Sequence, residues 1–412
     1  MSKIFVNYQG LKVGILAEAR GGIFFEYDPG FIASGHKLSP LNLPLGAGLR
    51  TRDSSPTMRL PGLFADSLPD NWGRRVMLEW FRQQGTPEHA VTPLMMLAYV
   101  AHRGMGALTY TPALDVPAAE DRSVSLFNLY QAAMLAGNSG PIDLAVFAQV
   151  GSSAGGARPK ALIGLARDQS GLILAGDDEL PPTHDAWLVK LDTSRDATDG
   201  PMEEAYACMA RAAGVEMPET RLLETRQADV VRRHFAVKRF DRSGSERIHH
   251  HTLAALCQVG GGDLNYETLL RVTRRLTRDE REVWRAFRRA IFNVLASNRD
   301  DHGKNHGFLY RNREWTLGPA YDLTFSSPQQ LPERGLSICG ERRAATESHL
   351  IELGESEALD RRTVRNVIEE VRGAISRWRE FAEQTQVPPI KAAEVDAVLQ
   401  SRSARLKDRA KL

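Results

Sequence analysis

The stretch NRDDHGKN, from Asn298 to Asn305, places carboxylates, cations and amides between two apolar segments. The segment WRAFRRAIFNVLAS precedes it and HGFLY follows it. A polar cluster in such surroundings costs free energy unless its groups are paired or bind something. From Asp300 to Asn305 the spacing is D-x-x-x-x-N. In phosphoryl-transfer loops of this spacing, the Asp accepts the proton of the attacking hydroxyl and the Asn holds a metal ion. The stretch therefore predicts a catalytic loop within a kinase-like fold.

A second metal ligand is predicted at Asp322, in the segment GPAYDLTFS between an extended run and a polar turn. Proteins hold Mg²⁺ with one or two side chains plus substrate phosphates, so Asn305 and Asp322 form a sufficient pair. His302 and His306 have the four-residue spacing of a zinc pair. The glycine between them and the lack of a third ligand nearby argue against zinc.

The front half of the chain supplies the remaining parts of a nucleotide site. The segment GSSAGGARPK, residues 151–160, is a glycine-rich turn whose backbone N–H groups can approach phosphate oxygens. Its glycines are Gly151, Gly155 and Gly156. Lys190, in the short strand WLVKLD, can reach the α- and β-phosphates, and either Glu203 or Glu204 on the next helix can pair with it. Glycine turn, strand lysine, helix glutamate, D-x-x-x-x-N and Asp occur in the order found in protein kinases.

The bulk composition is that of a soluble globular protein, with 42% hydrophobic and 25% charged residues among 412. The net charge of +2 gives no strong attraction to nucleic acid or to an anionic membrane. Three distant cysteines, no signal-like start and no long apolar run predict a cytoplasmic protein without a membrane segment.

Hydrophobic periodicity predicts a β-rich front half and a helical back half, and the order of the motifs above then indicates an α+β protein with a kinase-like two-lobed fold. Residues 1–115 form an extra β-rich N-terminal region, 116–240 the small lobe, and 241–412 a helical catalytic lobe. One long helix is predicted over residues 362–384, and another over 277–298 with a capping box of Thr277 and Glu280.

Together these motifs resemble the HipA family of bacterial toxin kinases. The resemblance rests on GSSAGGARPKAL, WLVKLD, VKRFDR, NRDDHGKN and AYDL, and on VNYQGLKVGIL and GLFADSLPDNWGRRVM near the start. It spans almost the whole chain. It implies an ATP- and Mg²⁺-dependent serine/threonine kinase that acts as the toxin of a toxin–antitoxin module. The implied partners are a HipB-like helix-turn-helix antitoxin, DNA only through that antitoxin, and a protein substrate such as an aminoacyl-tRNA synthetase or another translation protein.

The resemblance also implies roles for single residues. Asp300 matches the catalytic base, Lys190 the phosphate-binding lysine, and Asn305 and Asp322 the metal ligands. Phe240 matches the hinge contact to adenine, and Glu203 aligns better than Glu204 with the helix glutamate. The remaining implied nucleotide-binding residues are Ser152, Ser153, Gly155, Gly156, His302 and Lys304. Ser153, with Ser152 as its rival, matches a serine whose autophosphorylation switches the kinase off.

Several of these residues also have a purely structural interpretation. Asp301 is expected to be a solvated or structural neighbour rather than a second base, His302 to brace the loop, and Lys304 either to neutralise the transferred phosphate or to pair with Asp301. The run HHH at 249–251 is typical of a polar loop or strand start, and the arginine-rich helical segment 271–289 of a solvated face. Two other functions remain open: a small-molecule phosphotransferase on a kinase-like fold, and a catalytically weak corepressor of a DNA-binding antitoxin.

Overall fold

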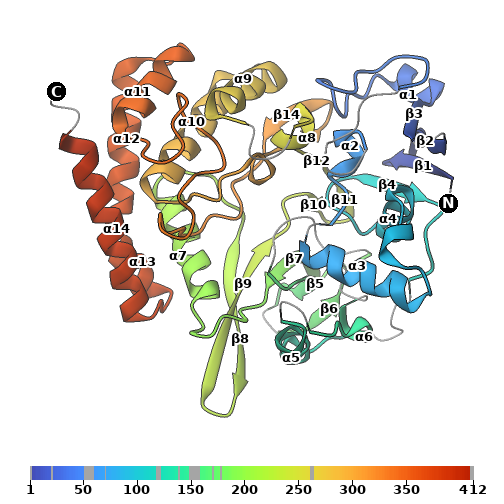
Figure 1. Ribbon diagram of the computed structural model, residues 1–412, viewed down its shortest axis with the longest axis horizontal. Helices are drawn as coiled ribbons and strands as arrows, with labels where there is room; N and C mark the ends of the chain where they lie inside the picture. The colour runs from blue at the N-terminus through green and yellow to red at the C-terminus, as the bar shows by residue number, and fades with distance from the viewer. Residues whose placement is uncertain are drawn as a thin grey trace.

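The computed structural model describes most of the chain (Figure 1). The described residues are 2–19, 22–50, 60–69, 71–116, 122–137, 140–147, 158–168, 171–176, 179–259 and 264–408, with side chains up to residue 402. None of the helices in these ranges is both long and apolar enough to cross a membrane.

The N-terminal region is built on an antiparallel sheet of order β3-β2-β1-β4. Its strands are β1 (Lys3–Tyr8), β2 (Leu11–Ala19), β3 (Gly22–Tyr27) and β4 (Leu108–Thr111). Its helices are α1 (Pro29–Ser34), α2 (Gly62–Ala65), α3 (Asn71–Gln83) and α4 (Pro93–Val100), with a 3₁₀ turn at Glu88–Ala90. In β1 every second side chain is buried, which is the alternation expected of a strand with one solvated face.

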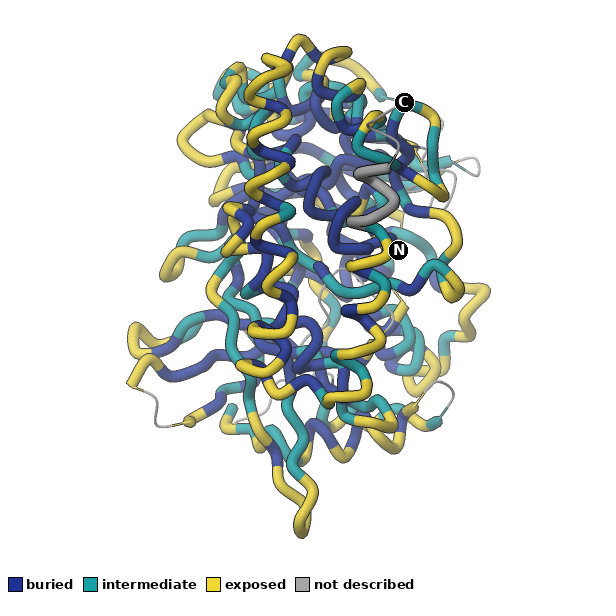
Figure 2. The backbone as a smooth tube through the Cα atoms, turned by 90° about the vertical axis from the view of Figure 1, so that its left-hand side faces the viewer, coloured by how far each residue is buried: buried dark blue, intermediate teal, exposed yellow. Residues whose placement is uncertain are grey.

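The small lobe contains a five-stranded antiparallel sheet of order β6-β5-β7-β9-β8. Its strands are β5 (Lys160–Ala166), β6 (Ile173–Ala175), β7 (His184–Lys190), β8 (Thr220–Gln227) and β9 (Val230–Lys238). Its helices are α5 (Leu126–Ala136), α6 (Leu144–Phe147) and α7 (Asp199–Ala212). The β8–β9 hairpin projects from the body of the molecule, and its tip is exposed (Figures 1 and 2).

The helical lobe surrounds α10, whose predicted apolar face is fully buried at Val283, Phe287, Ile291 and Val294. Its helices are α8 (Leu253–Cys257), α9 (Tyr266–Thr277), α10 (Glu280–Leu295), α11 (Glu347–Ser356), α12 (Arg361–Ile375), α13 (Trp378–Gln384) and α14 (Pro389–Asp408). The small sheet β12-β13-β14 packs beside them, with β12 (His249–Thr252), β13 (Gly307–Arg311) and β14 (Glu314–Leu317). A short ribbon of β10 (Arg242–Ser243) and β11 (Glu246–Arg247) precedes β12, and a 3₁₀ turn, η2, covers Gly303–Asn305.

Three local predictions were wrong. The side chain of Asp279 caps α10 by accepting a hydrogen bond from the Arg281 N–H, while Thr277 ends α9. The helix predicted over 362–384 is two helices, α12 and α13, because the chain turns between Ile375 and Trp378. Within the arginine-rich segment 271–289, Arg289 is buried at 2% exposure and donates to the carbonyl of Gly318.

The N-terminal region and the helical lobe share one core. A single cluster of buried apolar side chains runs from the N-terminal sheet through α4 to α10 and α12. A second cluster lies against the five-stranded sheet and contains Trp72 of α3 and Trp187 of β7. The N-terminal region is therefore part of the body that forms one wall of the cleft. The boundaries after residues 115 and 240 stay a prediction.

Polar contacts reinforce this junction next to the cleft. The carboxylate of Asp66 accepts hydrogen bonds from the backbone N–H and hydroxyl of Thr252 and contacts Nδ1 of His251 at 2.6 Å. Asp241, fully buried, accepts from the Gly106 N–H at 2.7 Å and from the guanidinium of Arg239. These contacts hold the segment after β9 against the N-terminal region.

Candidate active site

A cavity of about 120 Å³ lies between the five-stranded sheet and the helical lobe. Lys160 and Lys190 line it from the sheet, and Lys304, Asn305 and Asp322 line it from the helical lobe. The N-terminal region contributes Ala65, Asp66, Leu68 and Met105. Five predicted site residues therefore line one cavity, namely Lys190, Phe240, Lys304, Asn305 and Asp322, whereas Asp300 and His302 are not part of its lining. The wall from the N-terminal region is an addition that sequence reasoning missed.

Lys190 is the central cation of the cavity. It ends β7, and its Nζ forms ion pairs with Glu203 of α7 and with Asp322. Glu203 is 4% exposed, whereas the Glu204 carboxylate accepts hydrogen bonds from Arg211 and Thr220 on the other side of the helix. The structure thus pairs Glu203, and not Glu204, with the strand lysine.

The ion pairs control the charge of these groups. Burial by itself lowers the pKa of Lys190, but Asp322 and Glu203 outweigh it and hold that pKa above its ordinary value. Burial likewise raises the pKa of Asp322, but Lys190 and then Lys160 hold it well below the usual range. Asp322 is therefore an anion at any physiological pH, which is the state that a metal ligand needs.

The predicted catalytic loop is closed by a hydrogen bond between its two ends. Nδ2 of Asn305 donates to the backbone carbonyl of Asp300 at 2.7 Å, so the Asn side chain turns back as the D-x-x-x-x-N spacing predicted. The side chain of Asp300 is 61% exposed, and its carboxylate lies 3.6 Å from Nε2 of His302. Partial desolvation raises the pKa of Asp300. His302 lowers this pKa in part, whereas the nearby anions Asp322 and Asp301 raise it further.

Asp301 lies in the core beneath the loop, and its contacts match the structural interpretation. Its carboxylate accepts hydrogen bonds from the Gly335 N–H at 2.9 Å and from the Tyr266 hydroxyl, and it lies 3.7 Å from Arg334. At 1% exposure it cannot reach a substrate. The two adjacent carboxylates therefore point in different directions, Asp300 toward solvent and Asp301 into the scaffold.

Asp322 adopts a left-handed backbone conformation, with φ of 54°. Such a conformation costs a non-glycine residue about 1 kcal/mol or more and tends to occur at functional sites. The preceding residue, Tyr321, donates its hydroxyl to the Lys304 carbonyl at 2.6 Å and so ties this turn to the catalytic loop.

Phe240 follows β9 at the point where the two lobes join. The backbone N–H of Arg239 still pairs with the Ala186 carbonyl of β7 at 2.9 Å. The Phe240 ring stacks on Tyr321 at 5.7 Å and contacts His250 edge-on at 5.6 Å. The predicted hinge residue thus lies beside the cavity in a cluster of rings.

Two groups at the cavity were not recognised as site residues from the sequence. Lys160 is 4% exposed and lies opposite Lys190 in the β5–β7 register. The run HHH begins strand β12, which agrees with the strand-start alternative, but it is buried, and burial lowers the pKa of His249 to about 3. The sequence did contain a signal for Lys160, because it is the only charged residue of the segment KALIGLA and stands at its start.

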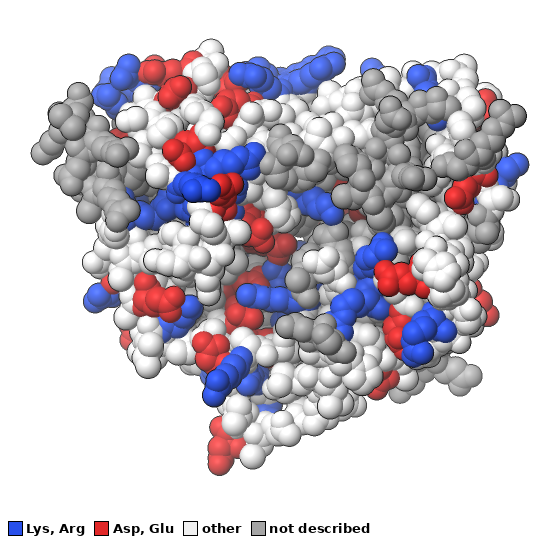
Figure 3. Space-filling view, viewed as in Figure 1, with Lys and Arg blue, Asp and Glu red and all other residues white. Residues whose placement is uncertain are grey.

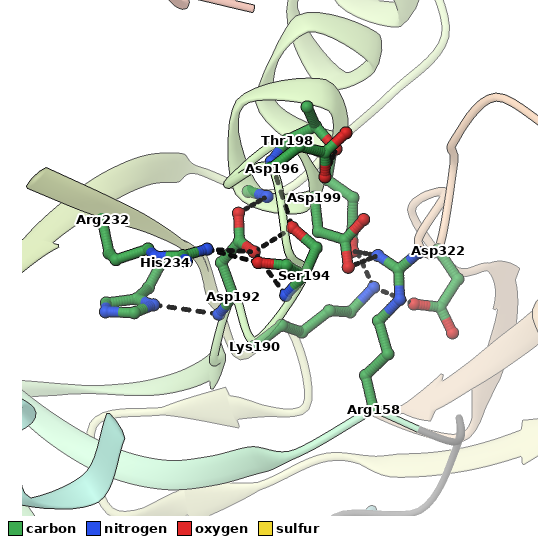
Figure 4. A network of polar contacts seen from close by, with 12 residues as sticks. Arg158, Lys190, Asp192, Ser194, Asp196, Thr198, Asp199, Arg232, His234 and Asp322 are labelled. Atoms are coloured by element: carbon green, nitrogen blue, oxygen red, sulfur yellow. Dashed lines mark hydrogen bonds and ion pairs between the residues drawn. The ribbon is translucent and has the colours of Figure 1, made fainter. Parts of the chain in front are cut away.

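A polar network holds the start of α7 in place (Figure 4). The buried carboxylate of Asp192 accepts hydrogen bonds from the hydroxyl and N–H of Ser194 and from the Gly200 N–H, while the Asp192 N–H donates to Nδ1 of His234. Because Nδ1 accepts, His234 is neutral there, and burial lowers its pKa to about 4. The network fixes the N-terminal turn of α7 and thereby the position of Glu203.

Arg158 joins the same helix from the other side. Its guanidinium lies 3.2 Å from Asp199 and 3.3 Å from Glu203 (Figure 4). The predicted glycine-rich turn, with Ser152, Ser153, Gly155 and Gly156, lies outside the described residues. Arg158 is the first described residue after positions 151–157.

The donor set at the cavity suits Mg²⁺ better than zinc. Asp322 supplies an ionised carboxylate and Asn305 an amide oxygen, the hard oxygen ligands that Mg²⁺ prefers. Among the described residues, including His302 and His306, there is no group of three or more His, Cys, Asp and Glu side chains that could hold a metal ion.

Two lobes around one such cleft define the class of kinase-like folds. Two protein-family models match the chain. The model of the HipA N-terminal domain matches residues 4–111, and the model of the HipA-like C-terminal domain matches residues 152–378. The chain belongs to the HipA family.

The fold is also that of a solved family member. The HipA toxin of Shewanella oneidensis MR-1, in complex with HipB and its operator DNA, aligns with a TM-score of 0.69 at 15% identity. The alignment covers 98% of this chain and 97% of that one.

Two proteins of Sinorhizobium fredii, Y4dM and Y4mE, whose names class them provisionally as kinases, are also similar. Y4dM is 28% identical over 35% of this chain and 39% of its own length. Y4mE is 31% identical over 27% of this chain and 28% of its own length. The matched part thus spans well under half of either relative.

Proposed function

We propose that the protein is an ATP- and Mg²⁺-dependent serine/threonine protein kinase that acts as the toxin of a toxin–antitoxin module. The observation that carries the proposal is the pairing of Lys190 with both Glu203 and Asp322 beside the loop that Asp300 and Asn305 close. In protein kinases the lysine–glutamate pair and the metal-binding Asp must both be in place for transfer.

Each group has a chemical task in this proposal. Asp300, whose side chain is exposed, orients the substrate hydroxyl and accepts its proton. Lys190 binds the phosphates from the small lobe, while Asn305 and Asp322 are the side chains that would hold Mg²⁺. Bound Mg²⁺ would neutralise charge on the β- and γ-phosphates. Phe240 and Lys304 both line the cavity; in this proposal Phe240 supplies the hinge backbone contact to adenine and Lys304 a cation for the phosphates.

The partners and the regulation follow from family membership. The Shewanella HipA was solved with HipB and operator DNA. We accordingly propose a HipB-like antitoxin for this chain, DNA contact only through it, a translation protein such as an aminoacyl-tRNA synthetase as substrate, and a cytoplasmic location. We also propose that autophosphorylation of Ser153, or of Ser152, limits the activity.

Labelled ATP tests the reaction class. The wild-type chain with Mg²⁺ and γ-labelled ATP should transfer label to protein in a bacterial lysate, and a chelator should abolish the transfer. Label in the small-molecule fraction alone would favour a small-molecule phosphotransferase. ATP binding without transfer to any acceptor would favour a corepressor.

A further inference from the structure

An open groove of about 960 Å³ lies away from the nucleotide cavity, between the N-terminal region and the helical lobe. Three segments form its walls: the chain after α1, the turn between α9 and α10, and the β13–β14 turn. Its lining includes the exposed cations Lys37, Arg275, Arg278 and Arg313. In the space-filling view, Lys and Arg side chains gather over α9 at the upper edge of the molecule (Figure 3).

These four cations are not neutralised within the described part of the chain. None of them forms an ion pair with a carboxylate there, although most arginines of the helical lobe do. The acidic residues of the groove are largely engaged elsewhere. Asp279 caps α10 and binds Arg281, and Glu282 binds Arg285 and the Leu317 N–H. The groove therefore presents unbalanced positive charge.

The backbone provides an independent observation. Arg278 and Arg313 both adopt left-handed conformations, with φ of 56° and 67°. Glycine or asparagine fits such positions with less strain, so an arginine there costs stability relative to glycine. Both positions line the same groove, and both carry a long cation.

The shape and charge of the groove suit a protein segment better than nucleic acid. Asp279, Glu282 and Glu314 lie between its cations, so the lining is not the continuous cationic stripe that typically binds a phosphate backbone. Separate guanidinium groups instead match separate carboxylates, which they can bind in bidentate fashion. The wall also has apolar residues, among them Leu41, Leu276 and Trp315, which can pack against the aliphatic parts of the acidic side chains of such a segment.

We propose that this groove binds an acidic segment of a partner protein, with Arg275, Arg278 and Arg313 as its carboxylate contacts. The surface is separate from the nucleotide cavity, so a bound segment would leave that cavity open. The proposal does not depend on the kinase activity of the chain.

Fluorescence anisotropy on the full chain tests the proposal with a labelled oligoglutamate peptide. The wild type should bind this peptide and not the matching oligoglutamine, and added salt should weaken binding. The double variant Arg278→Gly/Arg313→Gly should bind about tenfold more weakly. Its unfolding temperature should stay the same or rise, because glycine fits both conformations.

Two variants serve as controls. Arg362→Gln/Arg365→Gln removes the same charge from the exposed face of α12 and should bind like the wild type. Gln386→Gly places glycine at another left-handed position, φ 61°, without changing the charge. Undetectable binding of oligoglutamate by the wild type, or equal loss in the α12 variant, would overturn the proposal. Preference for an oligothymidylate over oligoglutamate would assign the groove to nucleic acid instead and would equally refute it.

Discussion

Lys160 and Lys190 lie opposite each other in the register of β5 and β7, and both lower the pKa of the same carboxyl group, that of Asp322. Lys190 also pairs with Glu203, so the two lysines stand against two carboxylates. Asp322 is thus held as an anion, which is the state that the proposed Mg²⁺ ligand needs.

Asp322→Asn should weaken Mg²⁺-dependent ATP binding by roughly tenfold or more, because an amide is a poorer ligand than an ionised carboxylate. Binding measured in excess chelator should change much less. Isothermal titration with and without Mg²⁺ separates the two effects. An unchanged Mg²⁺ titration in this variant would remove Asp322 from the ligand set.

The glutamate pair offers a matched comparison on one helix. Glu203→Gln should lower kcat/KM by about tenfold or more, because Lys190 loses the partner that positions it. Glu204→Gln changes a carboxylate that contacts Arg211 and Thr220 and should keep most of the activity. Steady-state kinetics of both variants decide the point, and equal losses would contradict the assignment.

Asp199 predicts a measurable pH dependence of stability. Burial, only partly offset by Arg158, raises its pKa to about 6 from 3.8. Because the folded-state pKa lies above the unfolded one, the folded chain binds more protons between about pH 4 and 6, and stability from this group falls as pH rises through that window. Asp199→Asn should therefore gain stability relative to the wild type as pH rises, by on the order of 2 kcal/mol before the lost Arg158 contact is subtracted.

Urea unfolding at several pH values measures the difference in stability between Asp199→Asn and the wild type. Because both proteins contain the same buried histidines, their contribution cancels in this difference. Asp185 is the control, because its pKa is lowered by Arg167 and Lys238, which outweigh its burial. Asp185→Asn should lose stability relative to the wild type as pH rises through the carboxyl range. A pH-independent difference for Asp199→Asn would show that its carboxyl group has an ordinary pKa in the folded chain.

Incubation with ATP and Mg²⁺ should add one phosphate to the peptide 151–160, at Ser153. A phosphate adds about −1.5 to −2 charges, which would repel ATP, and Arg158 is a nearby cation that could pair with it. Mass mapping should find no phosphate there in Asp300→Ala. Phosphate retained in Ser153→Ala would move the site to Ser152, and unchanged ATP affinity after modification would exclude an inhibitory role.

The sequence predicted those parts of the site that lie within single motifs. The return of Asn305 to Asp300 depends only on a short loop, and the pairing of Lys190 with a glutamate depends on adjacent elements. The wall formed by Asp66 and Met105 could not be predicted in this way, because it depends on how the N-terminal region packs on the helical lobe. The burial of β12 was missed for a similar reason, since three histidines look polar until a sheet and the N-terminal region cover them.

Asp300→Asn tests the central claim most directly, with Asp301→Asn beside it. Loss of a positioned base should lower phosphate transfer from γ-labelled ATP by about 10²–10⁴-fold, while ATP affinity and unfolding temperature stay near wild type because Asp300 is exposed. Asp301→Asn should instead lower stability, since its buried contacts with Arg334 and Tyr266 hold the scaffold. Near-wild-type transfer by Asp300→Asn would contradict the assignment of this loop as a kinase catalytic loop.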